Sequence, residues 1–230
     1  KRQARMLYLA LEIMGEKNLP EAMFYSFVSL PEGRMSTRRG TVVYLDDLVE
    51  ESVERARTEV KKRRPELSEG ECERIAQAVG TAAIRYNIVK VYHEKNMTFR
   101  WEDALDFEGD SAPFIMYSYA RSAGILENAG ETGDCPEPGR ALTEDSELHL
   151  VRSLAEFPEV LREAAEKMKP NAMAGYAHSL ASDFNQFYRD CPVARAEGEL
   201  KAARVVLVKH FMTVMKKTMY CLGLPVLDTM

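Results

Sequence analysis

The chain has 230 residues and is 46% hydrophobic, 29% charged and 9% aromatic, a composition that is typical of a globular protein and excludes a disordered or collagen-like chain. No apolar run approaches the roughly 18 to 20 residues that a membrane span requires, and the formal net charge of −5 means that nucleic-acid binding would need a local basic patch. The four cysteines are far apart and form no CxxC pair, so we expect no disulfide bonds, no zinc site and a reduced, cytoplasmic compartment.

The amino-terminal part predicts a small α/β unit. Apolar side chains at helical spacing over residues 2–14 predict a helix that Gly15 ends. The aromatic and β-branched run at 22–30 predicts a strand. A second short strand is predicted over residues 41–45, and Asp46 is expected to cap the helix that follows.

From Asp46 onward the pattern is helical. The first of these helices has acidic residues at its start and four basic residues, Lys61–Arg64, at its end, an arrangement that complements the helix dipole. Pro65 ends it. Ser68, followed by Glu71 three residues later, forms the capping box of the next helix.

The rest of the chain predicts more helices. One runs from Ser111 to Gly130, and a Gly- and Pro-rich loop follows at residues 130–140. Prolines are expected close to three later helix starts, at Pro158, Pro170 and Pro192. The last helix, at about 194–222, is apolar on most sides, which is typical of a central helix. We expect two units, 1–45 and 46–230, the second a bundle in which short loops favour antiparallel neighbours.

A basic segment, RMSTRRG at Arg34–Gly40, joins the two predicted strands. The guanidinium groups of Arg34 and Arg38 suit a polyanion because they neutralise phosphate oxygens, and the hydroxyl groups between them can donate hydrogen bonds. A solvated basic loop is the alternative interpretation, since the spacing is not that of a phosphate-binding Walker loop.

Two clusters of aromatic side chains and one stripe of lysines are further candidates. The aromatic residues are Phe114, Tyr117 and Tyr119, near Arg121, and Phe184, Phe187 and Tyr188. Such residues usually belong to the core, but exposed rings can stack on unpaired RNA bases. The stripe of Lys209, Lys216 and Lys217, like Lys61–Arg64, is either a solvated face or a set of phosphate contacts that position RNA without recognising its sequence. Acidic pairs such as Asp46 and Asp47 indicate a helix start rather than a metal site.

Several strings in register resemble one family. Arg34–Arg38 resembles the KMSKS signature of class I aminoacyl-tRNA synthetases, and GRMSTRRGTVVYLDDLVEE at 33–51 resembles its arginyl-tRNA synthetase form. VGTAAIRY at 79–86 and FRWEDALDFEGDSAPFIMYSYAR at 99–121 are similar to later blocks of that family. Residues 147–230 resemble its DALR anticodon-binding domain, including the Leu-Gly-Leu-Pro ending and the final Met.

This resemblance implies a mainly α fold, in which a helical-bundle anticodon-binding domain follows the small α/β end of a class I nucleotide-binding fold. It implies a parent enzyme that joins arginine to its tRNA using ATP, with Mg²⁺ accompanying the ATP and no cofactor bound tightly here. The implied ATP-binding residues are Arg34, Met35, Ser36, Thr37 and Arg38. Of these, Arg34, Ser36 and Arg38 would stabilise the transition state of adenylate formation. Arginine replaces both signature lysines but retains the charge.

The resemblance also implies an RNA site. The expected tRNA-binding residues are Phe114, Tyr117, Tyr188, Lys209, Lys216, Lys217 and Met230. Phe114 replaces the more usual tyrosine and so lacks a hydroxyl group, while Tyr119 and Phe184 are expected in the core. We expect neither a membrane nor DNA as a partner.

One part of the family pattern is missing. None of the four histidines lies in a HIGH-like string, and neither an arginine pocket nor the first half of the nucleotide-binding fold is evident. Together with a start at Lys1 rather than Met, this indicates a fragment that does not aminoacylate alone. Two alternatives remain: a stand-alone RNA- or partner-binding module derived from a synthetase, and a purely structural bundle.

Overall fold

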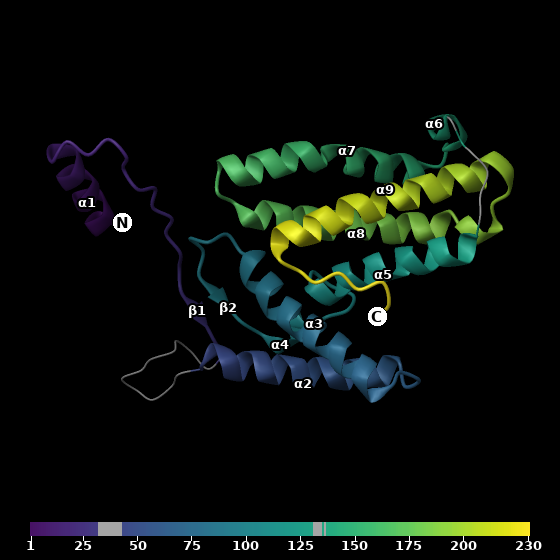
Figure 1. Cartoon of the computed structure of the whole chain (residues 1–230), viewed down its shortest axis with the longest axis horizontal. Coiled ribbons are helices and arrows are strands. Elements are labelled where there is room, and N and C mark those ends of the chain that lie inside the picture. Colours follow the sequence, from purple (N-terminus) through teal and green to yellow (C-terminus); the bar gives the residue numbers. More distant parts are fainter. Residues whose placement is uncertain (32–42, 131–134, 136) are drawn as a thin grey trace.

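The computed structural model describes residues 1–31, 43–130, 135 and 137–230, and within them the chain is mainly α-helical, as predicted (Figure 1). The helices are α1 (Arg2–Ile13), α2 (Leu45–Arg63), α3 (Glu69–Val89), α4 (Trp101–Ala104), α5 (Ala112–Ala129), α6 (Pro138–Ala141), α7 (Asp145–Glu166), α8 (Pro170–Asp190) and α9 (Gly198–Leu222), with a 3-10 turn η2 (Val193–Arg195). Strand β1 (Val28–Ser29) pairs in parallel with β2 (Met97–Thr98). In the described residues, no helix has the length and apolar character that a membrane crossing requires.

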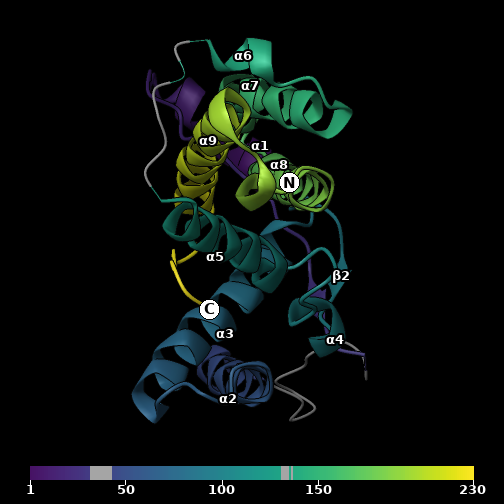
Figure 2. The ribbon, with the colours of Figure 1, turned by 90° about the vertical axis from the view of Figure 1, so that its right-hand side faces the viewer.

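Helices α5, α7, α8 and α9 form a bundle whose core lies on α8 and α9 (Figures 1 and 2). The rings of Phe184 and Phe211 are fully buried and stack with 3.9 Å between their centroids. Met215 and Met219 are also fully buried. Because so much of α9 faces other helices, the prediction of a central last helix is confirmed, although the helix proper starts at Gly198 and η2 occupies the preceding residues.

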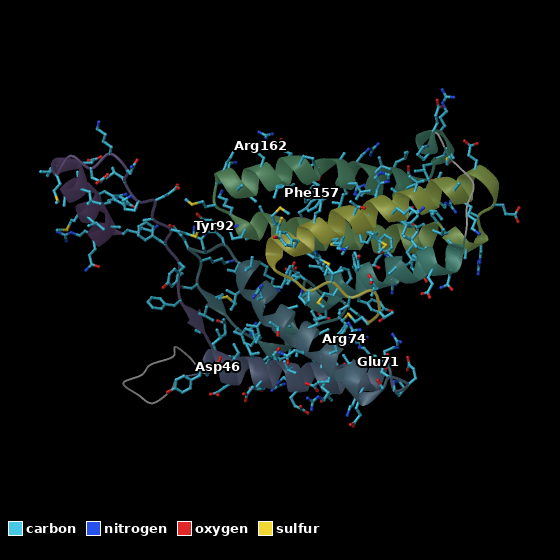
Figure 3. All side chains as sticks on the ribbon, in the orientation of Figure 1. Asp46, Glu71, Arg74, Tyr92, Phe157 and Arg162 are labelled. Atoms are coloured by element: carbon cyan, nitrogen blue, oxygen red, sulfur yellow. The ribbon has the colours of Figure 1, made fainter. Side chains whose placement is uncertain are left out.

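Helix α7 covers α8 with one apolar face. Phe157 points from α7 toward α8, where its ring centroid is 6.0 Å from that of Tyr176, whereas Arg162 on the same helix points to solvent (Figure 3). The expectation that Pro158 marks a helix start is wrong, because it lies inside α7. A proline in a helix interior removes one backbone hydrogen bond, and here packing against α8 holds the turns on either side. Pro170, in contrast, does begin α8.

Helices α2 and α3 form an antiparallel pair that packs below the bundle in Figure 1. Their closest approach is at Gly80, where an added Cβ atom would lie 2.7 Å from the main chain of Val53. Across the same contact the Ser52 hydroxyl donates a 2.9 Å hydrogen bond to the Gly80 carbonyl oxygen. The predicted capping box of Ser68 and Glu71 is present at the start of α3.

The strand predicted at 22–30 is largely wrong, and the one predicted at 41–45 lies partly outside the described residues, which resume at residue 43. Of residues 22–30, only Val28 and Ser29 form a strand, because the only partner in the described chain is the two-residue β2. Leu45 already belongs to α2, whose N-cap is Tyr44 rather than Asp46. Asp46 instead lies in the first turn, where a carboxylate favours the helix dipole.

The predicted loop 130–140 and the helix start expected near Pro192 also need correction. The short helix α6, Pro138–Ala141, begins inside that loop. Proline is readily accommodated in the first turn of a helix because its missing N–H has no partner to lose there. Pro192 precedes η2, and not α9, which starts six residues later.

Candidate nucleic-acid interface

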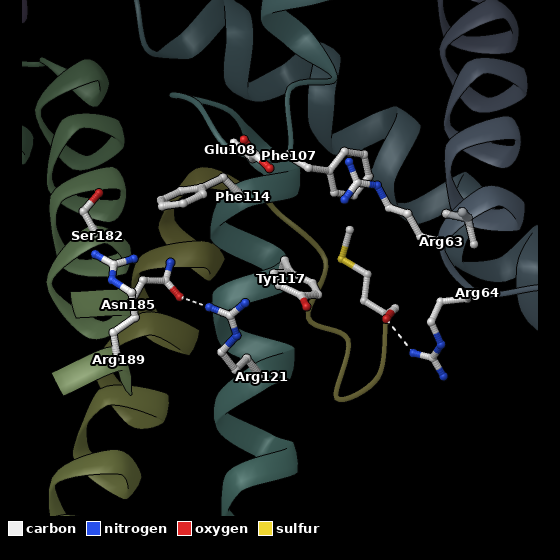
Figure 4. A pocket seen from close by; sticks show the side chains of 12 residues that line it. Arg63, Arg64, Phe107, Glu108, Phe114, Tyr117, Arg121, Ser182, Asn185 and Arg189 are labelled. Carbon is white, nitrogen blue, oxygen red and sulfur yellow. Dashed lines mark hydrogen bonds between the residues drawn. The ribbon is translucent and has the colours of Figure 1, made fainter. Parts of the chain in front are cut away.

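A cavity of about 780 Å³, which we call the first cavity, opens between α2, α5, α8 and the end of the chain (Figure 4). It is lined by Val60, Arg63, Arg64, Phe107, Glu108, Phe114, Tyr117, Arg121, Ser182, Asn185, Arg189 and Met230. Three of the residues predicted to bind tRNA, Phe114, Tyr117 and Met230, therefore come together from segments far apart in the sequence. Arginines from three helices surround these apolar groups, so the cavity combines aromatic surface with positive charge.

A second cavity, of about 600 Å³, adjoins the first. It is lined by Arg121, Gly124, Ile125, Asn128, Ala129, Tyr188, Arg189, Pro192, Val193, Ala194 and Arg195. Arg121 and Arg189 line both cavities. The predicted residue Tyr188 thus lies in this second cavity and not in the first.

Arg121 connects the two cavities. Its guanidinium carbon lies 4.7 Å from the ring centroid of Tyr117 and 4.9 Å from that of Tyr188. The guanidinium also donates a hydrogen bond to Oδ1 of Asn185 (Figure 4). The amide nitrogen of Asn185 in turn donates at 2.8 Å to the hydroxyl group of Ser118. A single guanidinium group, itself hydrogen-bonded to Asn185, thus lies beside both tyrosine rings, one on α5 and one on α8.

Exposure separates rings that can stack on a ligand from rings that belong to the core. Tyr117 is 41% exposed and Tyr188 is 42% exposed. Tyr119 and Phe184 are buried, as predicted. Burial, assisted by the charge of Asp228, raises the pKa of Tyr119.

The last residues of the chain lie against the bundle and bring Met230 to the first cavity. Gly223 ends α9 in the left-handed conformation, with φ of 64°, and its carbonyl oxygen accepts a 2.7 Å hydrogen bond from Arg85. Leu224 and Leu227 are buried. Arg64 then donates a 2.7 Å hydrogen bond to the main-chain oxygen of Met230. The segment 223–230 is therefore held at both ends, by Arg85 at Gly223 and by Arg64 at Met230.

The predicted lysine stripe lies elsewhere. Lys209, Lys216 and Lys217 are exposed on α9 and line neither cavity. No carboxylate lies within ion-pair distance of them among the described residues. Their phosphate contacts remain a prediction.

Of the four basic residues at the end of α2, the structure places Arg63 and Arg64 at the first cavity. The guanidinium carbon of Arg63 lies 4.3 Å from the ring centroid of Phe107. Both arginines also pair with carboxylates, Arg63 with Glu59 at 3.6 Å and Arg64 with Glu66. Hydrogen bonding to Arg64 lowers the pKa of Glu66.

Several lining residues are not among those predicted from the sequence. They are Phe107, Glu108, Ser182, Asn185 and Arg189 in the first cavity, and Asn128 and Arg195 in the second. Helical spacing could have indicated part of this set, because Ser182, Asn185 and Arg189 share one face of α8. Nothing in the spacing relates that face to Met230.

The predicted ATP-binding segment cannot be placed. Arg34, Met35, Ser36, Thr37 and Arg38 lie outside the described residues. Their proposed role therefore depends on the sequence alone.

Two family models match this chain. The DALR anticodon binding domain matches residues 115–230, and the catalytic domain of class I tRNA synthetases (R) matches residues 6–101. Similar curated sequences include the arginine–tRNA ligases of Methanocella arvoryzae, 49% identical over 228 residues, and Haloarcula marismortui, 44% identical over 230 residues. The alignments cover 97% of this chain but 39% and 40% of those proteins, so the chain spans about two fifths of their length.

Solved structures of arginyl-tRNA synthetases also superpose on this chain. The arginyl-tRNA synthetase of Thermus thermophilus superposes with a TM-score of 0.88 at 31% identity, over 99% of this chain and 39% of its own. The arginyl-tRNA synthetase from Plasmodium falciparum superposes with a TM-score of 0.78 over 99% of this chain and 40% of its own, at 20% identity, and so supports the fold alone.

Proposed function

Because this chain belongs to the arginyl-tRNA synthetase family, we propose that it is the part of an arginine–tRNA ligase that binds the anticodon loop of the tRNA. The main support is the pair of half-exposed rings, Tyr117 and Tyr188, that share one guanidinium group at Arg121. Single-stranded RNA loops are recognised by such aromatic rings, on which unpaired bases stack, and by guanidinium groups. The arginines around these rings make this region locally positive, although the whole chain carries a net negative charge.

The proposed parent enzyme activates arginine with ATP. In that reaction a carboxylate oxygen of arginine attacks the α-phosphorus of ATP, the bond from this phosphorus to the bridging oxygen breaks, and pyrophosphate leaves. We propose that the segment Arg34–Arg38 binds the phosphates. Arg34, Ser36 and Arg38 would stabilise the negative charge that develops on the phosphate oxygens in the transition state.

The amino-terminal helix favours a part of a larger enzyme over a stand-alone module. No residue of α1 is buried, and Met6, Leu9 and Ile13 are 61%, 58% and 87% exposed. Exposed apolar surface of this extent is unusual in a protein that functions alone. We propose that the remainder of a class I catalytic domain covers α1. A reading frame that continues upstream through such a domain would support this, and one that does not would favour the stand-alone module.

Binding of tRNA to the purified chain tests the proposal. We expect the chain to bind arginine-accepting tRNA more tightly than the same tRNA with its anticodon bases replaced, because the unpaired bases supply the stacking surface. Titration at fixed salt measures both affinities. Equal affinity for the two RNAs, or no binding to either, would contradict the proposed function.

A further inference from the structure

The hydroxyl group of Tyr86 joins three parts of the fold at one point. Tyr86 lies on α3, which packs against α5 and α8 (Figure 1), and it is 1% exposed. Its hydroxyl oxygen lies 2.6 Å from Oδ1 of Asp110, which directly precedes the capping residue of α5, and 3.0 Å from the main-chain oxygen of Ala174 on α8. A single buried donor thus faces acceptors from two other segments.

Lys90, at the end of α3, reinforces the contact with Asp110. Its ammonium group donates a 2.6 Å hydrogen bond to the main-chain oxygen of Asp110 and lies 3.7 Å from Oδ2 of the same residue. Burial, with the hydrogen bond to Asp110, raises the pKa of Tyr86, so the phenol keeps its proton and remains a donor. Hydrogen bonds with an ionised partner are among the stronger ones in proteins, and Asp110 is therefore held to α3 through its main chain and its carboxylate.

The start of α5 carries part of the first cavity. Ser111, the residue after Asp110, caps α5 by accepting a hydrogen bond from the main-chain N–H of Phe114. Phe114 and Tyr117 lie on the first two turns of this helix, and both line the first cavity. Because the turns of a helix move together, a shift of Asp110 relative to α3 would move both rings.

Packing alone does not explain the hydroxyl group of Tyr86. A phenylalanine ring would fill nearly the same core volume without burying a polar group that needs partners. A buried polar network whose members are all paired rigidifies the core and favours one arrangement of the elements that it joins. What the hydroxyl group adds is a fixed relation between α3, α8 and the residue that precedes the cap of α5.

We propose that Tyr86, acting through Asp110, is a positioning residue of the RNA site, which sets where α5 begins relative to α3 and α8 and so where the rings of Phe114 and Tyr117 lie. The inference rests on the proposed function, because it supposes that RNA binds at these rings. Tyr86 acts without touching the RNA: in the described chain, α3 supplies no lining residue to either cavity.

Tyr86→Phe removes the hydroxyl group and keeps the ring. We expect it to weaken binding of arginine-accepting tRNA to the chain by about 2- to 30-fold, the range for altered coupling within a side-chain network. The matched control is Tyr176→Phe, since Tyr176 is also buried and its hydroxyl donates a 2.9 Å hydrogen bond to the main-chain oxygen of Ser153. Neither Tyr176 nor Ser153 lines either cavity. Both variants should lose similar stability in thermal melts, and only Tyr86→Phe should lose affinity.

Combination with Tyr117→Ala distinguishes positioning from a general loss of stability. If Tyr86 acts through the position of the Tyr117 ring, Tyr86→Phe should cost less affinity once that ring is absent, so the two losses should be less than additive. Fully additive losses would show that the hydroxyl group affects binding by another route and would overturn the proposal.

Asp110→Ala replaces Tyr86→Phe if the latter does not fold, since the Asp110 side chain is 51% exposed. Removal of a negative charge by itself strengthens binding to a polyanion, whereas loss of the link between α3 and α5 should weaken it. We therefore expect a folded Asp110→Ala protein to bind the tRNA more weakly than the parent, a change opposite in sign to the effect of charge.

The outcomes separate this inference from the proposed function. If the parent chain does not bind the tRNA, the proposed function fails, and the role of Tyr86 fails with it. If the parent binds and Tyr117→Ala weakens it, but folded Tyr86→Phe binds like Tyr176→Phe, the proposed function stands and the role of Tyr86 is overturned. A folded Asp110→Ala protein that binds as tightly as the parent, or more tightly, would overturn it as well.

Discussion

Arg64, the residue that follows α2, donates a 2.7 Å hydrogen bond to the main-chain oxygen of Met230, 166 positions later in the sequence. The contact fixes the last residue of the chain at the wall of the first cavity. Helix α2, Leu45–Arg63, ends directly before Arg64, so this helix brings the Arg64 side chain to the proposed RNA site.

Loss of this contact should loosen Met230 and weaken RNA binding. We expect Arg64→Ala to reduce affinity for arginine-accepting tRNA about tenfold, because a hydrogen bond with a charged partner contributes about 1.5–3 kcal/mol. Arg74→Ala is the control, since Arg74 is exposed on α3 and lines neither cavity. Equal affinities for the two variants, measured by titration, would show that Met230 needs no anchor.

The two half-exposed tyrosines should contribute to binding and little to folding. We expect Tyr117→Ala and Tyr188→Ala each to lose about 1–3 kcal/mol of RNA binding free energy and to melt near the parent. Tyr→Phe at the same positions keeps the ring and should retain most of the affinity. Tyr119 lies on α5 like Tyr117 but is buried, so we expect Tyr119→Ala to unfold the protein instead. Stable alanine variants that bind as tightly as the parent would exclude both rings from the RNA site.

The lysines of α9 should position RNA without distinguishing sequences. We expect Lys216→Gln with Lys217→Gln to weaken binding to cognate and altered tRNAs alike. Each lost phosphate contact should lower the magnitude of the slope of log affinity against log salt concentration by about 1. Lys1→Gln with Lys167→Gln is the charge-matched control, since Lys1 pairs with Glu94 and Lys167 with Glu163, each at 2.7 Å. If the control changes the slope equally, the stripe acts only through net charge.

The buried ion pair of Glu147 and Arg204 should be important for stability. Glu147 is fully buried and accepts hydrogen bonds from Arg204 at 2.6 Å and from the backbone N–H of Thr143 at 2.9 Å. We expect Glu147→Gln to cost about 3–5 kcal/mol in urea unfolding, because it leaves a buried guanidinium group without its counter-charge. Glu163→Gln, at an exposed pair, should leave the midpoint unchanged. Identical midpoints for the two variants would contradict this prediction.

In the longer enzyme proposed to contain this chain, Arg38 should affect chemistry more than RNA binding. We expect Arg38→Ala to lower the turnover number about 10²- to 10³-fold, the usual effect of losing one contact to developing charge, with little change in the Kd for tRNA. Steady-state aminoacylation and tRNA titration measure the two quantities. Weaker tRNA binding at an unchanged turnover number would show that this segment contacts RNA only.

The sequence by itself determined most of the long helices, because their signals are local. The capping box at Ser68 and Glu71, the cap at Ser111 and the glycine stop at Gly223 each depend on a few neighbouring residues. Strands depend on partners elsewhere in the chain, so the run at 22–30 was predicted as a strand although only Val28 and Ser29 belong to one. The family resemblance, carried by motifs in order, was also evident before the structure.

Only the tertiary structure brought the residues of the proposed RNA site together. Composition and spacing could not distinguish Tyr117 from Tyr119, because both lie on α5 and only packing exposes one and buries the other. Nor could they bring Arg64 to Met230, or place Arg121 between two cavities that need α5, α8 and the end of the chain together. Local interactions fix secondary structure along the chain, whereas a binding surface forms where burial of apolar faces brings distant segments into contact.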